Sequence, residues 1–168
     1  MNMIHKPDVA FRPMQEADLA AVRELHARSF AALAADCHTP AEIAGHLALI
    51  AAPAYAEELA ASRLALAVEE ERIVATAGWI EVPDQARTAR IRKVFVDPAM
   101  ARRGLGSRMV RRAEDDARRA GHRRLIVRAN LNAVPLYAAL GYLAREEARM
   151  TVPGGISLPV VMMEKPFD

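Results

Sequence analysis

Short apolar runs and longer segments with apolar residues at helical spacing follow one another along this chain of 168 residues. Alternation of apolar and polar residues predicts strands, whereas a helical period predicts amphipathic helices. The chain is expected to form strands over 9–12, 64–68, 73–80, 89–96, 125–127, 142–152 and 156–164. Helices are expected over 15–34, 40–61 with an interruption at Pro53, 105–120 and 132–140.

Turn and cap residues separate these elements. Thr39 precedes Pro40 as an N-cap, and Gly121 and Gly141 each end a helix. The element order is βααβββαβαββ, which predicts an α/β fold with a mixed, mostly antiparallel central sheet and helices on both faces. Because no repeat, linker or break in composition divides residues 1–168, we expect a single domain.

Composition excludes several classes of protein. Hydrophobic residues make up 52% of the chain, yet no apolar run approaches the ~20 residues of a membrane span. The N-terminal residues lack the apolar stretch of a signal peptide. Cys37 is the only cysteine, so neither an internal disulfide nor a zinc site of paired cysteines can form. We therefore expect a cytoplasmic, globular protein without a metal.

The net charge of +2 conceals an uneven distribution. Residues 1–84 carry 6 basic and 13 acidic residues, whereas residues 85–168 carry 17 and 8. A genome rich in G and C explains the abundance of arginine but not its concentration in one half. The asymmetry suggests an anionic ligand on one side of the molecule and a cationic one on the other.

The segment 94–107 reads VFVDPAMARRGLGS and is the most informative part of the chain. A strand leads into a loop with two arginines and two glycines, and a helix begins there. Unpaired backbone N–H groups at a helix start attract anions, and glycine lets a ligand approach the main chain. The first turn of this helix has no carboxylate, which favours a phosphate at that place. The spacing fits neither a Walker loop nor a dinucleotide fingerprint.

A second segment, 130–142, reads NLNAVPLYAALGY. Asn132 is expected to be the N-cap of a short helix in which Pro135 lies in the first turn. Tyr137 follows on the same helix, where a tyrosine can belong to the core or to a site.

Together the two segments resemble the GCN5-related N-acetyltransferase (GNAT) superfamily. The resemblance implies that acetyl-CoA binds where two parallel strands separate, with the main chain of Val94 and Val96 pairing with the pantetheine arm. It implies that Tyr137 is the general acid that protonates the departing CoA thiolate. The residues implied to bind the cofactor are Val94, Phe95, Val96, Arg102, Arg103, Gly104, Leu105, Gly106, Ser107 and Asn132.

Two positions depart from the family pattern. Ala101 stands where relatives have Gln or Arg, so one side-chain contact to phosphate is missing. The strand before the cofactor site lacks the glutamate that serves as general base in many relatives, and Glu81 is the nearest substitute. Deprotonation of the amine through ordered water is an equal alternative. We expect direct transfer to the amine, without an acetyl-enzyme on Cys37.

The acceptor and the partners remain open. The acidic half favours a cationic amine, either a small molecule or a peptide, and relatives commonly form homodimers. One alternative is an acyl-CoA-binding sensor domain without turnover. Another takes the nine arginines of residues 101–124 as a nucleic-acid surface, but no aromatic residue interleaves with them. We therefore expect no nucleic-acid partner.

Overall fold

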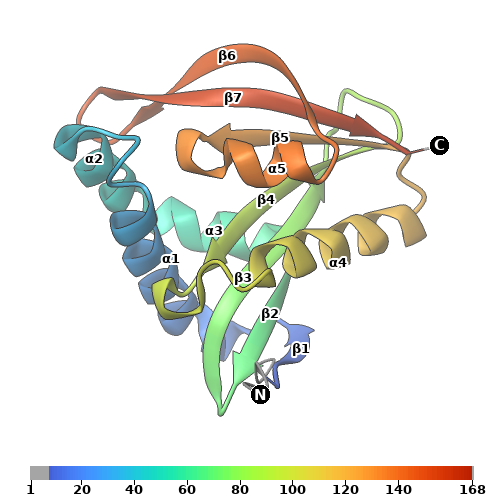
Figure 1. The fold of residues 1–168 in the computed structure, drawn as a ribbon, viewed down its shortest axis with the longest axis horizontal. Coiled ribbons are helices and arrows are strands. Elements are labelled where there is room, and N and C mark those ends of the chain that lie inside the picture. The colour runs from blue at the N-terminus through green and yellow to red at the C-terminus, as the bar shows by residue number, and fades with distance from the viewer. Residues whose placement is uncertain (1–7, 168) are drawn as a thin grey trace, which may run out of the picture.

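Seven strands form one continuous sheet in the computed structural model, which describes residues 8–167 (Figure 1). Their order across the sheet is β1-β2-β3-β4-β5-β7-β6. Neighbours run antiparallel except β4 and β5, which run parallel. The strands are β1 (Ala10–Pro13), β2 (Arg63–Glu69), β3 (Arg72–Glu81), β4 (Thr88–Val96), β5 (Arg124–Asn130), β6 (Leu143–Val152) and β7 (Ile156–Pro166). The expected mixed, mostly antiparallel sheet is confirmed.

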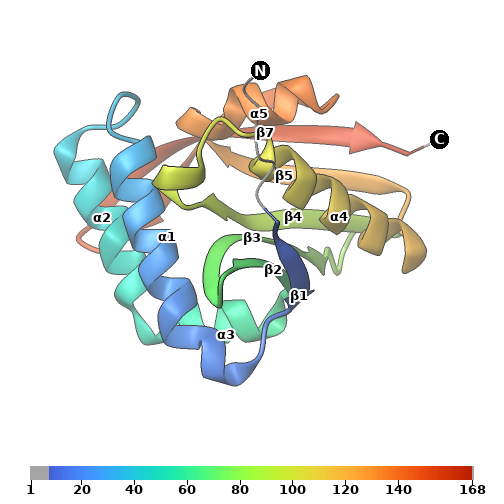
Figure 2. The same ribbon diagram turned by 60° about the horizontal axis from the view of Figure 1, so that its bottom comes forward.

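Helices cover both faces of this sheet (Figure 2). On one face α4 packs against β2, β3 and β4, and α5 lies beside β5. On the other face α1 contacts β3 and β4, α2 contacts β6 and β7, and α3 contacts β2. The helices are α1 (Leu19–Leu33), α2 (Pro40–Ala51), α3 (Pro53–Ala61), α4 (Leu105–Arg119) and α5 (Val134–Ala139). The predicted order of helices and strands is observed, except that the expected interruption at Pro53 divides the second predicted helix into α2 and α3.

Local chemistry sets the ends of the helices. Thr39 caps α2 as predicted, because its side chain accepts from the Glu42 N–H at 3.1 Å. The first long helix begins later than expected, since Glu16–Asp18 forms a 3₁₀ turn before it. Asp18 closes that turn by accepting from the backbone N–H of Gln15 at 2.8 Å. The sequence pattern located the helices but could not distinguish this tight turn from α-helix.

The core lies mainly between α4 and the sheet. The apolar stripe predicted for residues 105–120 is buried as a whole, and its members are Leu105, Met109, Val110, Ala113 and Ala117. They join a cluster with the inward-facing residues of the central strands, which include Ala77, Ile91 and Val127. The burial of this face anchors α4, and so fixes where the helix begins relative to the end of β4.

Gly78 of β3 has no room for a side chain. A Cβ atom there would lie 2.6 Å from the carbonyl oxygen of Arg63 and 2.9 Å from the Cα of Leu64. Both are backbone atoms of β2, so Gly78→Ala forces two strands apart. We expect the free energy of unfolding to fall by about 2 kcal/mol, as for other overpacked cores. Chemical denaturation measures this, and an unchanged midpoint would contradict the close packing of β2 on β3.

Candidate functional site

The two central strands separate after a short stretch of pairing (Figure 1). The parallel ladder between β4 and β5 ends where Ile91 faces Val127. Residues 92–96 of β4 stay with β3, and residues 128–130 of β5 stay with β7. The sheet therefore opens into two arms, and residues 92–96 are only half-buried although they belong to its central strand.

The open edge of β4 presents main-chain hydrogen-bonding groups. The N–H of Asp97 donates to the carbonyl of Val74 on β3, at 2.8 Å. Because successive residues of a strand point their N–H and C=O groups to opposite sides, those of Val96 and Val94 point away from β3 and into the opening. Phe95 between them stacks its side chain on His26, with the ring centroids 4.1 Å apart. An extended chain that lies in the opening can thus pair with β4 as an additional strand does.

The loop after β4 ends at the N-terminus of α4. Arg102 and Gly104 both have left-handed backbone angles, with φ of 62° and 76°. Left-handed residues that alternate with right-handed ones can turn successive N–H groups toward one point, which is a geometry that holds anions. Gly104 caps α4 without a side-chain hydrogen bond, and the first turn has no acidic residue. The N–H groups at this helix end are therefore free to bind an anion.

The arginines of this loop add positive charge. Arg102 and Arg103 are exposed, and neither forms an ion pair with any residue of 8–167. A Cβ on Gly104 would meet no atom within 4 Å, so the main chain here borders open space. The loop joins backbone donors and guanidinium groups on an accessible surface, as a pyrophosphate site requires.

The start of α4 also contacts the second predicted segment. Leu105 is buried and holds the helix on the core, while Gly106 and Ser107 are half-buried. A Cβ on Gly106 would lie 3.5 Å from Val96 Cγ2 and 3.7 Å from Leu136 Cδ2. Gly106 therefore lies where the end of β4 meets α5. The two sequence segments, far apart along the chain, are neighbours in the fold.

Asn132 does not cap α5, and this expectation was wrong. Residues 131–133 form a 3₁₀ turn, and the N-cap position of α5 is Ala133. The turn places the side chain of Asn132 elsewhere: its Oδ1 is buried and has no hydrogen-bond partner within the described chain. A buried acceptor without a donor is costly, so this atom is suited to an N–H group of a ligand.

Tyr137 of α5 is buried, with 4% of its surface exposed, and its ring packs edge-on against Tyr142 at a centroid distance of 5.4 Å. Tyr142 donates to the buried carboxylate of Glu114 at 3.1 Å, and Lys165 donates to the same oxygen at 3.0 Å. Burial raises the pKa of Tyr137, so its phenol keeps its proton at neutral pH. In the part of the chain that the structure describes, no side-chain hydrogen bond uses this phenol.

Glu81 lies away from this group of residues. It ends β3, faces Ala89 at the start of β4, and is 75% exposed with His122 Nε2 at 3.7 Å. At Ala89 the strands β4 and β5 are still paired, so Glu81 stands at the closed end of the opening. The structure therefore does not bring Glu81 together with Tyr137 and the loop at Gly104. The predicted strand order suggested that Glu81 is close to the site. The strand register instead places Glu81 beside Ala89, at the end of the opening opposite the loop at Gly104.

Comparison with known proteins agrees with this geometry. Residues 19–142 match a family model described as the acetyltransferase (GNAT) family. The chain belongs to the GNAT acetyltransferase family. No curated protein matches the sequence of this GNAT chain.

Solved GNAT structures share the whole fold. A GCN5-related N-acetyltransferase of Rhodopseudomonas palustris aligns with a TM-score of 0.86 and 23% identity over 99% of this chain and 100% of its own. The PaiA N-acetyltransferase of Thermoplasma acidophilum, in complex with coenzyme A, aligns with a TM-score of 0.76 and 14% identity. The alignment covers 95% of this chain and 99% of PaiA. YncA of Salmonella typhimurium, with its cofactor acetyl-CoA, aligns with a TM-score of 0.65 and 21% identity. The alignment covers 96% of this chain and 95% of YncA. At these identities the similarity establishes the fold.

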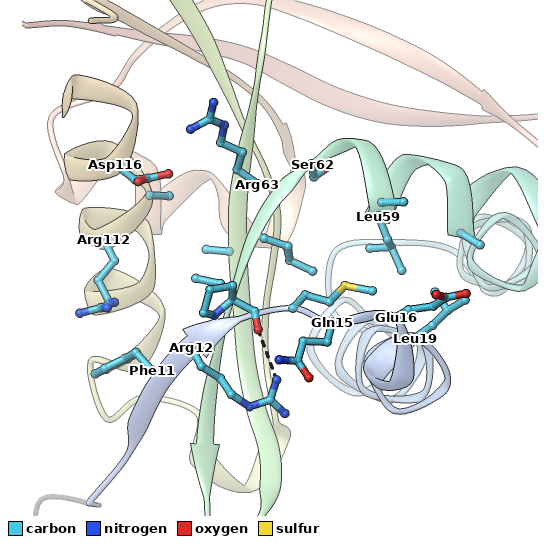
Figure 3. A pocket seen from close by; sticks show the side chains of 18 of the residues that line it. Phe11, Arg12, Gln15, Glu16, Leu19, Leu59, Ser62, Arg63, Arg112 and Asp116 are labelled. Atoms are coloured by element: carbon cyan, nitrogen blue, oxygen red, sulfur yellow. Dashed lines mark hydrogen bonds between the residues drawn. The ribbon is translucent and has the colours of Figure 1, made fainter. Parts of the chain in front are cut away.

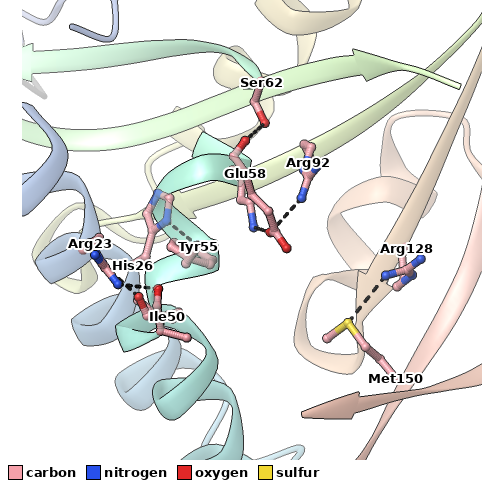
Figure 4. A network of polar contacts seen from close by, with 11 residues as sticks. Arg23, His26, Ile50, Tyr55, Glu58, Ser62, Arg92, Arg128 and Met150 are labelled. Atoms are coloured by element: carbon pink, nitrogen blue, oxygen red, sulfur yellow. Dashed lines mark hydrogen bonds and ion pairs between the residues drawn. The ribbon is translucent and has the colours of Figure 1, made fainter. Parts of the chain in front are cut away.

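A β-bulge in β4 was missed from the sequence. Thr76 faces Phe95 but Gly78 faces Arg92, so β4 has an extra residue there, and Lys93 has a φ of 58°. The bulge places Arg92 and Lys93 side by side, and both donate to Glu58 Oε2 of α3, at 2.9 and 2.6 Å (Figure 4). Lys93 interrupts an apolar alternation, and that interruption was the only available signal.

A buried chain of hydrogen bonds supports the bulge. Thr76 Oγ1 donates to the carbonyl oxygen of Lys93 at 2.6 Å, so it must accept from His26 Nε2 at 2.7 Å. His26 Nδ1 then accepts from the hydroxyl of Tyr55, at 2.7 Å. Burial is the main cause that lowers the pKa of His26 well below its usual value, so the ring is neutral. These hydrogen bonds link α1 and α3 to the bulge, where β4 and β5 of this GNAT sheet separate.

A large cavity of about 1030 Å³ lies near the edge of the sheet formed by β1 and β2 (Figure 3). It is lined by β1, β2, α3 and the second half of α4, with Arg12, Arg63 and Arg112 among its polar residues. None of the residues predicted for the cofactor lines it. The opening between β4 and β5, rather than this cavity, unites the two segments that carry the GNAT resemblance.

Two further properties concern residues 8–167. None of their helices combines the length and the apolar character needed to cross a membrane. No group of three or more His, Cys, Asp or Glu residues is arranged to hold a metal ion among them.

Proposed function

We propose that this protein is an acetyl-CoA-dependent N-acetyltransferase that moves an acetyl group directly to a primary amine in a ternary complex. The observation that carries the proposal is the separation of β4 and β5, with free main-chain groups along one arm and the anion-binding loop at its end. This arrangement accommodates a long cofactor with an amide-containing arm and a charged pyrophosphate.

The residues present fit acetyl-CoA. Main-chain groups of Val94 and Val96 would pair with amides of the pantetheine arm. The N–H groups of residues 104–107, with Arg102 and Arg103, would hold the pyrophosphate. The unpartnered Oδ1 of Asn132 would accept from an N–H of the arm. When bound, acetyl-CoA supplies the activated acetyl thioester.

This chain's own residues then orient the reactants and move protons. Residues 92–96 of β4, between the loop and the join at Ile91, would hold the arm, so the bulge at Lys93 would border the acetyl group. Tyr137 holds a proton at Oη and donates it to the sulfur as CoA leaves. An ordered water passes the proton of the incoming amine to solvent, because Glu81 faces Ala89, beyond the point where β4 and β5 join, and its side chain is 75% exposed. Positioning two reactants in one opening supplies much of the rate acceleration.

The first test is binding. Acetyl-CoA and CoA are expected to raise the melting temperature by mass action, whereas NAD is not. A screen of primary amines should then show release of CoA. Stabilisation by acetyl-CoA without turnover on any amine would contradict the proposed activity and favour a sensor domain. Absence of stabilisation would contradict the cofactor site itself.

The two loop arginines provide a quantitative prediction. Replacing Arg102 and Arg103 together by Gln should weaken acetyl-CoA binding about tenfold, which corresponds to one charge-assisted contact to phosphate at an exposed site. The control is Arg111→Gln with Arg123→Gln, because these exposed arginines lie outside the loop and remove the same charge. Isothermal titration should show near-normal binding for the control. An equal loss in both variants would indicate general electrostatic attraction rather than a site.

A further inference from the structure

The face of the opening that lies opposite α4 carries a concentration of positive charge. Because of the bulge, Arg92 and Lys93 point to this same face, where both contact Glu58. Across the opening, Arg128 is the first residue of β5 beyond the last pair with β4. Figure 4 shows Arg92 with Glu58 on one side and Arg128 on the other. Arg90 precedes the split on β4 and completes what we call the basic cluster: Arg90, Arg92, Lys93 and Arg128.

Carboxylates do not balance the basic cluster. Glu58 is the one acidic residue of 8–167 that contacts any member, and it serves both Arg92 and Lys93. Arg128 has only the sulfur of Met150 as a side-chain partner, at 3.5 Å. Arg90 Nε is buried and has no partner within the described chain. The cluster thus keeps a clear excess of positive charge, with guanidinium donors left free.

The electrostatics of the cluster show that its charges oppose one another. The pKa of Lys93 is lowered to about 8, mainly by burial; Arg92 and Arg128 act in the same direction, and Glu58 opposes them. The pKa of Arg90 is also lowered, first by burial and then by Arg128 and Arg92. Such a group is stabilised by an anion that enters between its members.

Position connects the cluster with the reaction. The cluster borders the point where β4 and β5 join, which is where the reacting end of a cofactor laid along β4 would arrive. α4 and the loop at Gly104 approach from the other face, so the cofactor leaves this face to a second reactant. Glu58 is 39% exposed, and its Oε1 accepts no hydrogen bond from the described residues. Its pKa is lowered by Lys93 and Arg92 although burial opposes them, so it is ionised at neutral pH.

We infer that the acceptor is a primary amine that carries an anionic group, a carboxylate or a phosphate, which binds Arg90 and Arg128 while Glu58 attracts the amine. This inference rests on the proposed acetyl transfer and specifies its substrate class. It reverses the expectation of a purely cationic acceptor, because the charge near the split differs from that of the N-terminal half as a whole. Two guanidinium groups from separate strands suit an anion with several oxygens.

Matched pairs of amines test the inference. Each L-amino acid is compared with its amide, and O-phosphoethanolamine with ethanolamine, so that only the anionic group differs. We expect kcat/KM to be at least tenfold higher for the anionic member of one pair, and which pair responds distinguishes carboxylate from phosphate. A binding readout that needs no turnover is the added thermal stabilisation by the same amines in the presence of CoA.

Variants of exposed Arg128 give the residue-level test. Arg128→Gln should raise KM for the anionic amine about tenfold, change kcat little, and leave KM for its neutral partner unchanged. Arg111→Gln is the control and should alter neither. Acetyl-CoA stabilisation should persist in Arg128→Gln, which shows that the variant folds and retains the cofactor site.

The outcomes separate the two proposals. Neutral or polycationic amines that react as well as anionic ones, or an Arg128→Gln variant with an unchanged preference, would overturn the inference and leave the acetyltransferase proposal intact. Absence of acetylation on every amine, anionic or neutral, would overturn the proposed function and the inference with it.

Discussion

Tyr137→Phe is expected to lower kcat about a hundredfold, the size of effect that loss of a general acid produces. The phenylalanine keeps the packing against Tyr142 and removes only the hydroxyl. Because that hydroxyl has no side-chain partner in the described part of the chain, its loss leaves no protein group unsatisfied. Steady-state release of CoA with a reactive amine measures the effect, and binding of acetyl-CoA should remain within about twofold.

The matched control is Tyr142→Phe. This variant also removes a buried phenol from the same aromatic pair, but the lost hydroxyl is the one that donates to Glu114. We expect about 1–2 kcal/mol less stability and a nearly normal kcat, because a buried acceptor loses its neutral donor and retains Lys165. Full activity in Tyr137→Phe, or equal loss in both variants, would remove Tyr137 from the mechanism.

Acidification is expected to destabilise the fold through buried histidines. The pKa of His46 is lowered to about 4, mainly by burial and further by Lys93 and His38, and that of His26 is lowered well below its usual value. Below pH 6.5, the ordinary pKa of histidine, the unfolded state binds more protons at these two histidines than the native state does. The free energy of unfolding therefore falls as the pH falls. Between about pH 6.5 and 4.5 the proton linkage of His46 removes about 2 kcal/mol of stability, and His26 acts in the same direction.

Replacing His46 separates its contribution to the pH dependence of stability from that of His26. His46 stacks on Phe30 with centroids 3.9 Å apart, and neither of its ring nitrogens has a partner within the described chain. His46→Phe keeps an aromatic ring there and should reduce the acid-dependent loss of stability by about 2 kcal/mol. Denaturant unfolding at a series of pH values measures the slope. A slope unchanged in this variant would show that His46 does not titrate on unfolding in this range.

The order of elements was readable from the sequence because local signals agree with the tertiary structure. Thr39 before Pro40 and Gly121 after an amphipathic helix are cap signals that need no distant partner. The extension of β5 to Asn130 was missed, since β7 supplies its pairing partners. Long-range pairing decides strand length, and the alternation of side chains reports it only where one face is buried.

The cofactor loop was predictable, and the acceptor side was not. Gly104 and the arginines before it form a contiguous motif whose chemistry is local. Glu58 and Lys93 meet only because of a bulge, which shifts which side chains share a face of β4. The exposed position of Glu81 likewise follows from strand register rather than from proximity in sequence. The net charge of each half of the sequence could not reveal the basic cluster, because its residues come from two strands, β4 and β5, that only the fold brings together.

A crystal structure of the acetyl-CoA complex tests the central claim most directly, because the claim is a statement about place. The account predicts pantetheine between β4 and β5, amides paired with Val94 and Val96, and pyrophosphate on the N–H groups of residues 104–107. Cofactor bound instead in the cavity beside β1, α3 and α4, or an empty opening at millimolar acetyl-CoA, would contradict it.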